Sequence, residues 1–176
     1  RYAAYLIIKF RPKNKVKFLS IKFNNLNYKK LNKINLHSPK MSEYSAYIAK
    51  NNKIREILKI YQTKFSKKYK NCCIEGRDIS TKILPNSDIK FFFKCNLKTA
   101  SFRRFKELKK INVTIKLIDV KKALKIRNTS DTKRKNSPLL KHRDSIVIDT
   151  GKLNKSAMIS KMSKYIEKEF KKKYDN

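Results

Sequence analysis

Short apolar runs alternate along this chain with longer segments in which apolar residues recur every three or four positions. Three runs, Cys72–Ile74, Asp88–Cys95 and Ser145–Asp149, have the length and composition of β-strands. Because helical segments separate them, this order predicts an α/β fold with a parallel sheet covered by helices on both faces. The aromatic centre of the second run, Phe91–Phe93, predicts a strand that is buried on both faces.

The helical periodicity places the predicted helices around these strands. They cover residues 1–10, 38–66, a segment from about Leu97, 114–126 and 155–173. Arg11-Pro12 ends the first helix, and the second region divides near Asn51-Asn52. The alternating run Val16–Phe23 predicts a small strand pair or a mobile insertion within Lys13–Leu36.

The length and composition fit one globular domain. The chain has 176 residues, of which 40% are hydrophobic and 11% aromatic, enough to bury a core. The net charge of +34 by itself suggests nucleic-acid binding, because Lys and Arg release counterions from phosphates. Most of these basic residues are Lys interleaved with Asn and Ile along the whole chain, a pattern that favours compositional drift. A dedicated nucleic-acid surface concentrates Arg and aromatic residues on one element.

The cysteines and histidines do not indicate a metal or redox site. Cys72, Cys73 and Cys95 lack CxxC spacing, and we expect buried, reduced, structural thiols. His37 and His142 lie far apart in polar surroundings and are expected on the surface. No apolar stretch approaches the roughly 18 residues of a membrane span, and no signal peptide is recognisable, so we expect a cytoplasmic protein.

Glycine is scarce, which excludes one common phosphate site. The sequence contains only Gly76 and Gly151, from which no glycine-rich phosphate loop can be built. Gly151-Lys152 is followed by Leu153, where such a loop needs Ser or Thr. The chain also begins with Arg1 inside an apolar helical run, from which we expect an N-terminal truncation.

The tripeptide Gly76-Arg77-Asp78 follows the first predicted strand directly. It therefore falls at the carboxyl edge of the sheet, where open α/β folds bind ligands. Gly76 permits a tight turn, Arg77 offers a forked donor for phosphate, and Asp78 can hold an arginine or accept from a sugar or base. A solvated turn is the alternative for an isolated tripeptide of this kind.

A second group of charged residues precedes the third predicted strand. Arg127, Asp131 and Arg134 are spaced four and three apart, so they share one face of a helical turn. Two arginines with an aspartate between them can hold a transferring phosphoryl group while the carboxylate restrains the cations. A solvated charge run is the alternative in so basic a chain.

Together these motifs resemble bacterial cytidylate kinases, members of the nucleoside-monophosphate kinase family. The resemblance extends over EGRDISTKILPNSDIKFF, from Glu75 to Phe92, and over Ser137-Pro-Leu139 with the following Asp144–Asp149. It covers residues 42–150 firmly and 13–40 weakly. It implies a three-layer α/β/α core with a small lid and a parallel sheet whose first strand and phosphate loop are missing, because the resemblance places the N-terminal truncation before or at that loop.

The resemblance also implies roles for individual residues. On the substrate side these are Arg1, Ser45, Arg55, Arg77 and Asp78, with Ala46 as an alternative to Ser45 by ungapped alignment. Arg127, Asp131 and Arg134 would be catalytic, and Lys133, Arg103 and Arg104 would face ATP. The chain departs from the family pattern at Ser80, where glycine is common, and at Ser130 and Thr132, where the lid carries further arginines.

The resemblance implies a kinase that transfers the γ-phosphoryl of ATP, with Mg²⁺, to CMP or dCMP. It predicts one domain over residues 1–176: residues 1–66 hold the remnant of the first helix and the monophosphate region, 70–126 and 144–176 the core, and 127–143 the lid. We expect a monomer that binds nucleic acid only non-specifically at low salt. Without a phosphate loop, this chain is expected to be inactive. The alternatives are a basic nucleic-acid-binding protein and an inactive pseudokinase.

Overall fold

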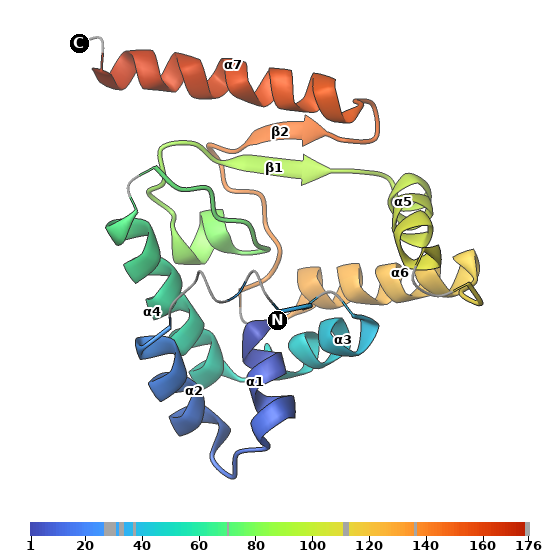
Figure 1. The fold of residues 1–176 in the computed structure, drawn as a ribbon. Helices are drawn as coiled ribbons and strands as arrows, with labels where there is room; N and C mark the ends of the chain where they lie inside the picture. Colours follow the sequence, from blue (N-terminus) through green and yellow to red (C-terminus); the bar gives the residue numbers. More distant parts are fainter. Residues whose placement is uncertain are drawn as a thin grey trace. The chain divides into compact units, whose positions relative to one another are not determined.

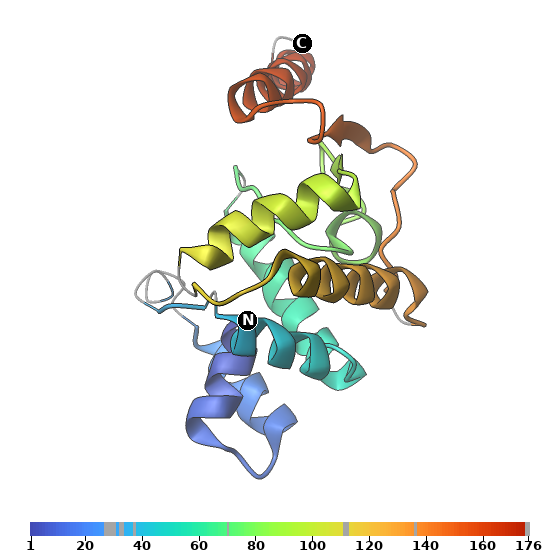
Figure 2. The same cartoon turned by 90° about the vertical axis from the view of Figure 1, so that its right-hand side faces the viewer.

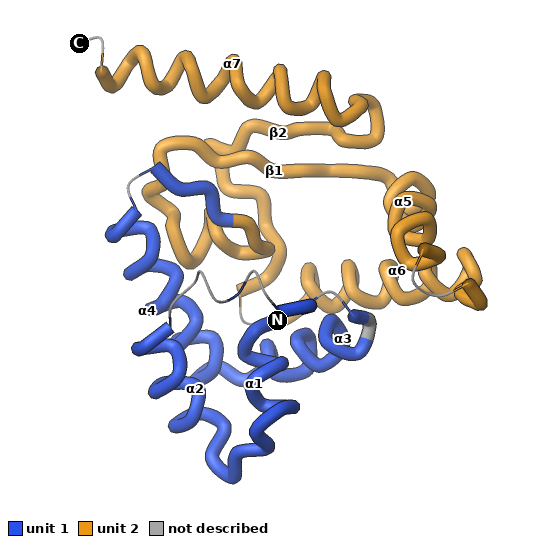
Figure 3. Tube along the Cα trace, in the orientation of Figure 1, with its two compact units in different colours: residues 1–74 blue, residues 75–176 orange. Residues whose placement is uncertain are grey.

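The computed structural model describes residues 1–26, 31, 34–36, 38–69, 71–110, 113–135 and 137–174. The chain divides into two compact units, Arg1–Ile74 and Glu75–Asn176 (Figure 3). His37 lies outside the described residues, as do parts of the predicted Lys13–Leu36 segment.

Unit 1 is built from helices. They are α1 (Tyr2–Phe10), α2 (Lys15–Asn24), α3 (Pro39–Ile48) and α4 (Asn52–Lys68) (Figure 1). Polar side chains cap three of these helices at their N-termini. Each capping side chain accepts a hydrogen bond from the main-chain N–H three residues later in the chain. The caps are Asn14, Ser38 and Asn51, with distances of 2.9, 3.2 and 3.1 Å. The division that the sequence predicts near Asn51-Asn52 is confirmed by the cap at Asn51.

The core of unit 1 forms where α1 meets α2 and α3, and where α2 meets α4. Ala3 and Ala4 are 2% and 0% exposed, and their small side chains allow the neighbouring helices to approach α1 closely. Leu19 and Phe23 supply the buried face of α2, and the Phe23 ring packs edge-on against Tyr61 of α4 at 5.4 Å. Burial of each such large side chain contributes about 1.5–3 kcal/mol.

The predicted strand pair over Val16–Phe23 is wrong, because this segment is helix α2. The run alternates over short stretches, yet Val16, Leu19 and Phe23 also recur at helical intervals. The cap at Asn14 and the burial of Leu19 and Phe23 select the helix.

Unit 2 contains a parallel pair of strands with helices around it. Its elements are a π-helical turn (Ile79–Ile83), β1 (Phe91–Lys94), α5 (Leu97–Lys109), α6 (Leu117–Lys133), β2 (Ile146–Asp149) and α7 (Lys155–Tyr174). Helices α5 and α6 pack against each other (Figure 2). Helix α7 lies along the strands (Figure 1), where the Tyr165 ring meets Phe91 at 6.4 Å and Lys173 Nζ donates to Asp88 at 2.7 Å. The predicted α/β class with a parallel sheet is confirmed.

The two strands are paired in register from Phe91 opposite Ile146 to Lys94 opposite Asp149. The N–H of Ile146 donates to the carbonyl of Lys90 at 2.8 Å, and that of Thr150 donates to Lys94 at 2.9 Å. Since main-chain groups alternate between the two edges of a strand, those of Phe91 and Phe93 point away from β2. No third strand joins the sheet within the part of the chain that the structure describes.

Two predictions about burial are wrong in unit 2 and at its border. Phe93 is 49% exposed, so β1 is not buried on both faces. Cys72–Ile74 is not a strand, since no neighbouring strand pairs with it among the described residues. Cys72 and Cys73 are consequently exposed rather than buried, and Cys95 is half-buried; all three are free thiols.

Candidate functional site

Five charged residues of unit 2 converge at the C-terminal end of α6. Arg127 and Asp131 lie on this helix, Arg134 caps it, and Arg77 and Asp78 come from the turn before Ile79–Ile83. We call these five residues the arginine cluster. Helix α6 extends to Lys133, beyond the predicted end at Ile126, so the first half of the predicted lid is helical. This extension sets Arg127 and Asp131 one turn apart on the same face.

Asp131 is the centre of the arginine cluster. Its Oδ2 lies 3.3 Å from Arg77 Nε and 3.8 Å from Arg127 Nε, and its Oδ1 lies 3.3 Å from Arg134 Nη1. The exposed fractions of the side chains rise from 15% for Asp131 through 22% for Arg134 and 35% for Arg77 to 48% for Arg127. A single, largely buried carboxylate therefore holds three guanidinium groups, with Arg127 outermost.

Arg134 connects the two carboxylates of the arginine cluster. Its Nη2 lies 4.0 Å from Asp78 Oδ1, while its Nε donates to the main-chain carbonyl of Ser137. Asp78 is 8% exposed, and its own carbonyl accepts the N–H groups of Lys82 and Ile83 at 2.9 and 3.3 Å. The π-helical turn thus begins at Asp78 and fixes the main chain that carries its carboxylate.

Gly76 lets this turn form beside Ile79. A Cβ atom added to Gly76 would lie 2.6 Å from Ile79 Cγ1, closer than side-chain atoms approach one another. Its φ is not positive, so the space beside Ile79, and not a left-handed conformation, accounts for the glycine. The predicted tight turn before Arg77 therefore depends on the missing side chain.

The charges of the arginine cluster do not balance. Three arginines face two aspartates, which leaves one positive charge in excess. Arg134 Nη2 and Asp131 Oδ2 are buried and form no hydrogen bond within the described residues. Burial lowers the pKa of the Arg77 guanidinium, the charges of Arg127 and Arg134 lower it further, and Asp131 opposes them. An anion bound here would compensate the excess charge.

The predicted substrate residues Arg1, Ser45 and Arg55 belong to unit 1. Arg1 precedes α1, and its carbonyl accepts the N–H of Tyr5 at 2.9 Å. The Ser45 hydroxyl donates to the carbonyl of Met41 at 2.6 Å, which places it against its own helix. Arg55 Nη1 donates to the carbonyl of Ala49 at 3.5 Å. The structure does not relate these residues to the arginine cluster, and their proposed roles stay predictions.

The three residues predicted to face ATP lie on two helices of unit 2. Arg103 Nη2 donates to the carbonyl of Thr150 at 2.7 Å, which ties α5 to the segment after β2. Arg104 pairs with Glu107 at 2.9 Å, and Lys133 is exposed at the last position of α6. Arg103 alone of these three reaches the carboxyl end of the sheet.

Neither glycine of the chain forms a cradle for the phosphates of ATP within the residues that the structure describes. Gly76 lies in the turn beside Ile79, and the Gly151 N–H already donates to Asp149 Oδ1 at 3.0 Å.

Among the described residues, no three His, Cys, Asp or Glu side chains gather where they could hold a metal ion. Likewise, none of the described helices has the length and apolar character needed to cross a membrane.

His142, expected on the surface, is half-buried, and its Nδ1 accepts the N–H of Asp144 at 3.2 Å.

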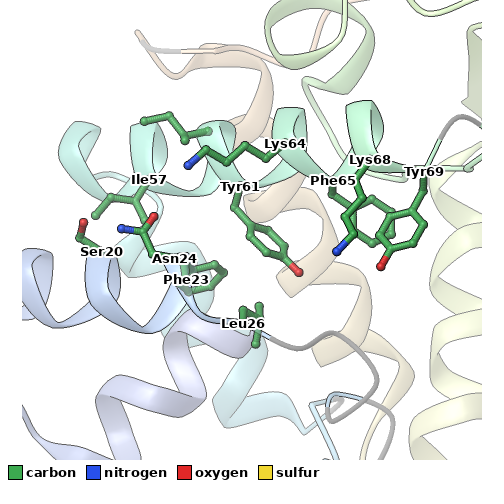
Figure 4. A pocket seen from close by; sticks show the side chains of 11 residues that line it. Ser20, Phe23, Asn24, Leu26, Ile57, Tyr61, Lys64, Phe65, Lys68 and Tyr69 are labelled. Atoms are coloured by element: carbon green, nitrogen blue, oxygen red, sulfur yellow. The ribbon is translucent and has the colours of Figure 1, made fainter.

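Unit 1 contains a separate cavity of about 230 Å³ between α2 and α4 (Figure 4). Its wall on α4 is a row of aromatic rings, Tyr61, Phe65 and Tyr69, with Lys64 and Lys68 beside them. None of the predicted site residues lines it. The arginine cluster therefore remains the candidate site.

Sequence reasoning missed the contribution of Ser137. Its side chain has no part in the arginine cluster, whereas its carbonyl accepts from Arg134 Nε. Leu139 also contributes through the main chain, since its N–H donates to the carbonyl of Asp131 at 2.7 Å. The one sequence signal for this segment was the motif Ser137-Pro-Leu139. The motif contributed to the family resemblance but predicted no contact with Arg134 or Asp131.

Comparison with known proteins decides the family. The sequence model that describes cytidylate kinases matches residues 4–168. This chain belongs to the cytidylate kinase family. A cytidylate kinase of Clostridium botulinum (strain Okra / Type B1) is 36% identical over 129 residues, which are 73% of this chain and 57% of that protein. The chain thus spans little more than half of that relative.

Other members of the family match over more of the chain. The cytidylate kinase of Thermosipho melanesiensis is 30% identical over 161 residues, covering 89% of this chain and 73% of the relative. That of Mesomycoplasma hyopneumoniae (strain 7448) is 32% identical over 162 residues, covering 91% and 69%. The similarity includes both units, so both derive from the same family.

Proposed function

We propose that the arginine cluster binds the 5′-phosphate of CMP or dCMP, and that this chain forms the acceptor-nucleotide side of a cytidylate kinase. One observation supports this most strongly: three arginines surround Asp131 with an excess positive charge and a buried donor, Arg134 Nη2, that makes no hydrogen bond within the described residues. The family, and the naming of its relatives as cytidylate kinases, are consistent with a nucleotide phosphate as the anion.

In this proposal the guanidinium groups bind phosphate oxygens in forked pairs. Asp131 and Asp78 keep the arginines apart and oriented before the ligand arrives, so that little reorganisation is needed on binding. During transfer of a phosphoryl group, negative charge is spread over its oxygens, and Arg127 and Arg134 would stabilise it. Asp131 restrains both cations and takes no proton in this scheme.

The co-substrate is proposed to be ATP with its Mg²⁺, as the family implies. The residues present do not fit the phosphates of ATP, because neither glycine lies in a phosphate loop. The proposed part of this chain in the transfer is therefore limited to the acceptor side, where it binds the acceptor and Arg127 and Arg134 stabilise the negative charge. Arg103, Arg104 and Lys133 are proposed on the ATP side, and Arg1, Ser45 and Arg55 on the CMP side.

Calorimetric titration at about 150 mM salt, where exposed charges are largely screened, tests the proposal. We expect CMP to bind more tightly than AMP or UMP. Arg134→Lys should weaken CMP binding by about tenfold or more, because lysine has no planar fork. Arg143→Lys is the matched control, since Arg143 is 91% exposed and lies outside the arginine cluster. Equal affinity of both variants would show that Arg134 does not bind the phosphate.

The alternative is a nucleic-acid-binding protein, which the net charge of +34 suggests but the family of the chain does not favour. In competition with CMP at the same salt concentration, selective nucleic-acid affinity without preference for CMP would establish it. A monomeric state and a cytoplasmic location complete the proposal and stay predictions.

A further inference from the structure

The chain reverses direction directly after α6. The helix ends at Lys133 with Arg134 as its C-terminal cap, and five residues later the Leu139 N–H donates to the carbonyl of Asp131 at 2.7 Å. This bond satisfies one of the carbonyl groups that the last turn of a helix leaves without an intrahelical partner. It also lays Ser137–Leu139 against the turn that carries Asp131 and Arg134.

Ser137 adopts a conformation that serine rarely takes. Its φ is +52°, in the left-handed region, where the Cβ of an L-residue crowds the main chain. Among the described residues, Arg11 with φ +45° is the other non-glycine residue of this kind. Both precede a proline, Pro12 and Pro138, whose ring fixes its own φ and removes its N–H. The backbone at Ser137 is therefore held by its surroundings and not by its own preference.

This conformation aims the Ser137 carbonyl at Arg134. The carbonyl accepts from Nε, the inner donor of the guanidinium. Because the guanidinium is planar, a bond to Nε fixes the plane in which both Nη atoms lie. Nη1 is then directed to Asp131 at 3.3 Å, and Nη2 lies 4.0 Å from Asp78 without a hydrogen bond. The two carboxylates approach Nη1 and Nη2, whereas the Ser137 carbonyl accepts from Nε, so this carbonyl is a separate restraint on the group.

We infer that Ser137, through the left-handed backbone that precedes Pro138, is a positioning residue that holds the Arg134 guanidinium ready for the phosphate. The inference rests on the proposed function for the identity of the phosphate, and on the geometry alone for the restraint. The Ser137 hydroxyl has no part in it, so the requirement is for a backbone conformation and not for a side-chain chemistry.

Substitutions at position 137 separate these two requirements. Ser137→Gly removes the hydroxyl and adopts the left-handed region freely, and Ser137→Asn tolerates it. Ser137→Val disfavours it, because β-branched residues are outliers at positive φ. Arg11→Val is the control for the same strain at a position in unit 1 outside the arginine cluster. Pro138→Ala adds a variant without steric conflict, which loosens the segment while α6 stays intact.

The first readout is the hydrogen exchange of the Arg134 Nε–H in the ligand-free chain, measured by ¹⁵N NMR and assigned by its absence in Arg134→Lys. Wild type, Ser137→Gly and Ser137→Asn should protect it equally. Ser137→Val should exchange about tenfold faster or more, as expected when a hydrogen bond to a charged group is lost. Pro138→Ala should lie between them. Far-UV circular dichroism shows whether Ser137→Val is folded. If it is not, the Nε–H exchange of Pro138→Ala tests the inference in its place.

The second readout is CMP affinity. Ser137→Val should bind CMP about tenfold more weakly, whereas Ser137→Gly and Arg11→Val should match wild type. Unchanged Nε–H exchange in Ser137→Val and Pro138→Ala overturns the inference whatever the affinity for CMP. If wild type has no affinity for CMP while the exchange follows the expected order, the proposed function fails and the positioning of Arg134 stands.

Discussion

Replacing Asp131 by asparagine tests whether the arginine cluster is held together by a single carboxylate. The substitution preserves the size of the side chain and removes its charge. Arg77, Arg127 and Arg134 then share only Asp78 as a counter-charge, and the excess of positive charge rises from one to two. We expect a marked loss of stability in unit 2.

The magnitude follows from burial and distance. The Arg134 contact at 3.3 Å joins side chains that are 22% and 15% exposed, so a charge-assisted hydrogen bond of about 1.5–3 kcal/mol is at stake. The Arg77 contact, 35% exposed, adds about 1 kcal/mol, and the half-exposed Arg127 contact adds only a few tenths. The free energy of unfolding should fall by about 3 kcal/mol.

Urea unfolding followed by far-UV circular dichroism measures this change. Asp119→Asn is the control, because Asp119 lies exposed in the first turn of the same helix. Its loss should be about 0.5 kcal/mol, the contribution of an acidic residue near a helix N-terminus. If Asp131→Asn costs no more than Asp119→Asn, the carboxylate does not organise the arginines and the reasoning is refuted.

Three further outcomes are expected. Binding of RNA or DNA should show no sequence preference and collapse between about 50 and 200 mM salt, as filter binding can measure; persistence would indicate a dedicated surface. The chain supplied with ATP and CMP should form no more than traces of CDP, because its two glycines provide no phosphate loop; rapid CDP formation would disprove this. The hydrogen bond from Lys173 lowers the pKa of Asp88, so Lys173→Met should raise that pKa toward 3.8 in a ¹³C NMR titration, and an unchanged value would contradict the pairing. Because the folded pKa is the lower one, the pair stabilises the chain above the ordinary pKa of aspartate, and this contribution is lost as the pH falls through the lowered pKa.

Local signals predicted most helices. Ser38, Asn51 and Asn96 are cap residues that stand directly before apolar periodicity, and each caps a helix in the structure. The failures concern information that is not local. Cys72–Ile74 has strand composition, but a strand also needs a neighbour, and the sequence does not show which neighbours are present. The apolar residues of Val16–Phe23 fit both the spacing of a strand and that of a helix, and packing against other helices stabilises the helix.

The sequence indicated which residues belong to the arginine cluster, but not the helix length and main-chain contacts that hold them in place. The spacing of Arg127, Asp131 and Arg134 places them on one face without knowledge of the fold. The length of α6 was underestimated, because Arg127–Lys133 is polar and resembles a loop in composition. The role of Ser137 could not have been predicted. Every residue type has a main-chain carbonyl that can accept a hydrogen bond, and the residue type serine does not indicate a left-handed backbone conformation.

The two-stranded sheet has a consequence for how the protein behaves in bulk solution. The outward main-chain groups of Phe91 and Phe93 and the exposed Phe93 ring form a template on which a strand of another molecule can pair. The net charge of +34 opposes such encounters through long-range repulsion. Salt shortens that repulsion from about 30 Å at 0.01 M to about 3 Å at 1 M. Colloidal stability should therefore be greatest in dilute buffer, and raising the salt concentration should promote association through the strand edge.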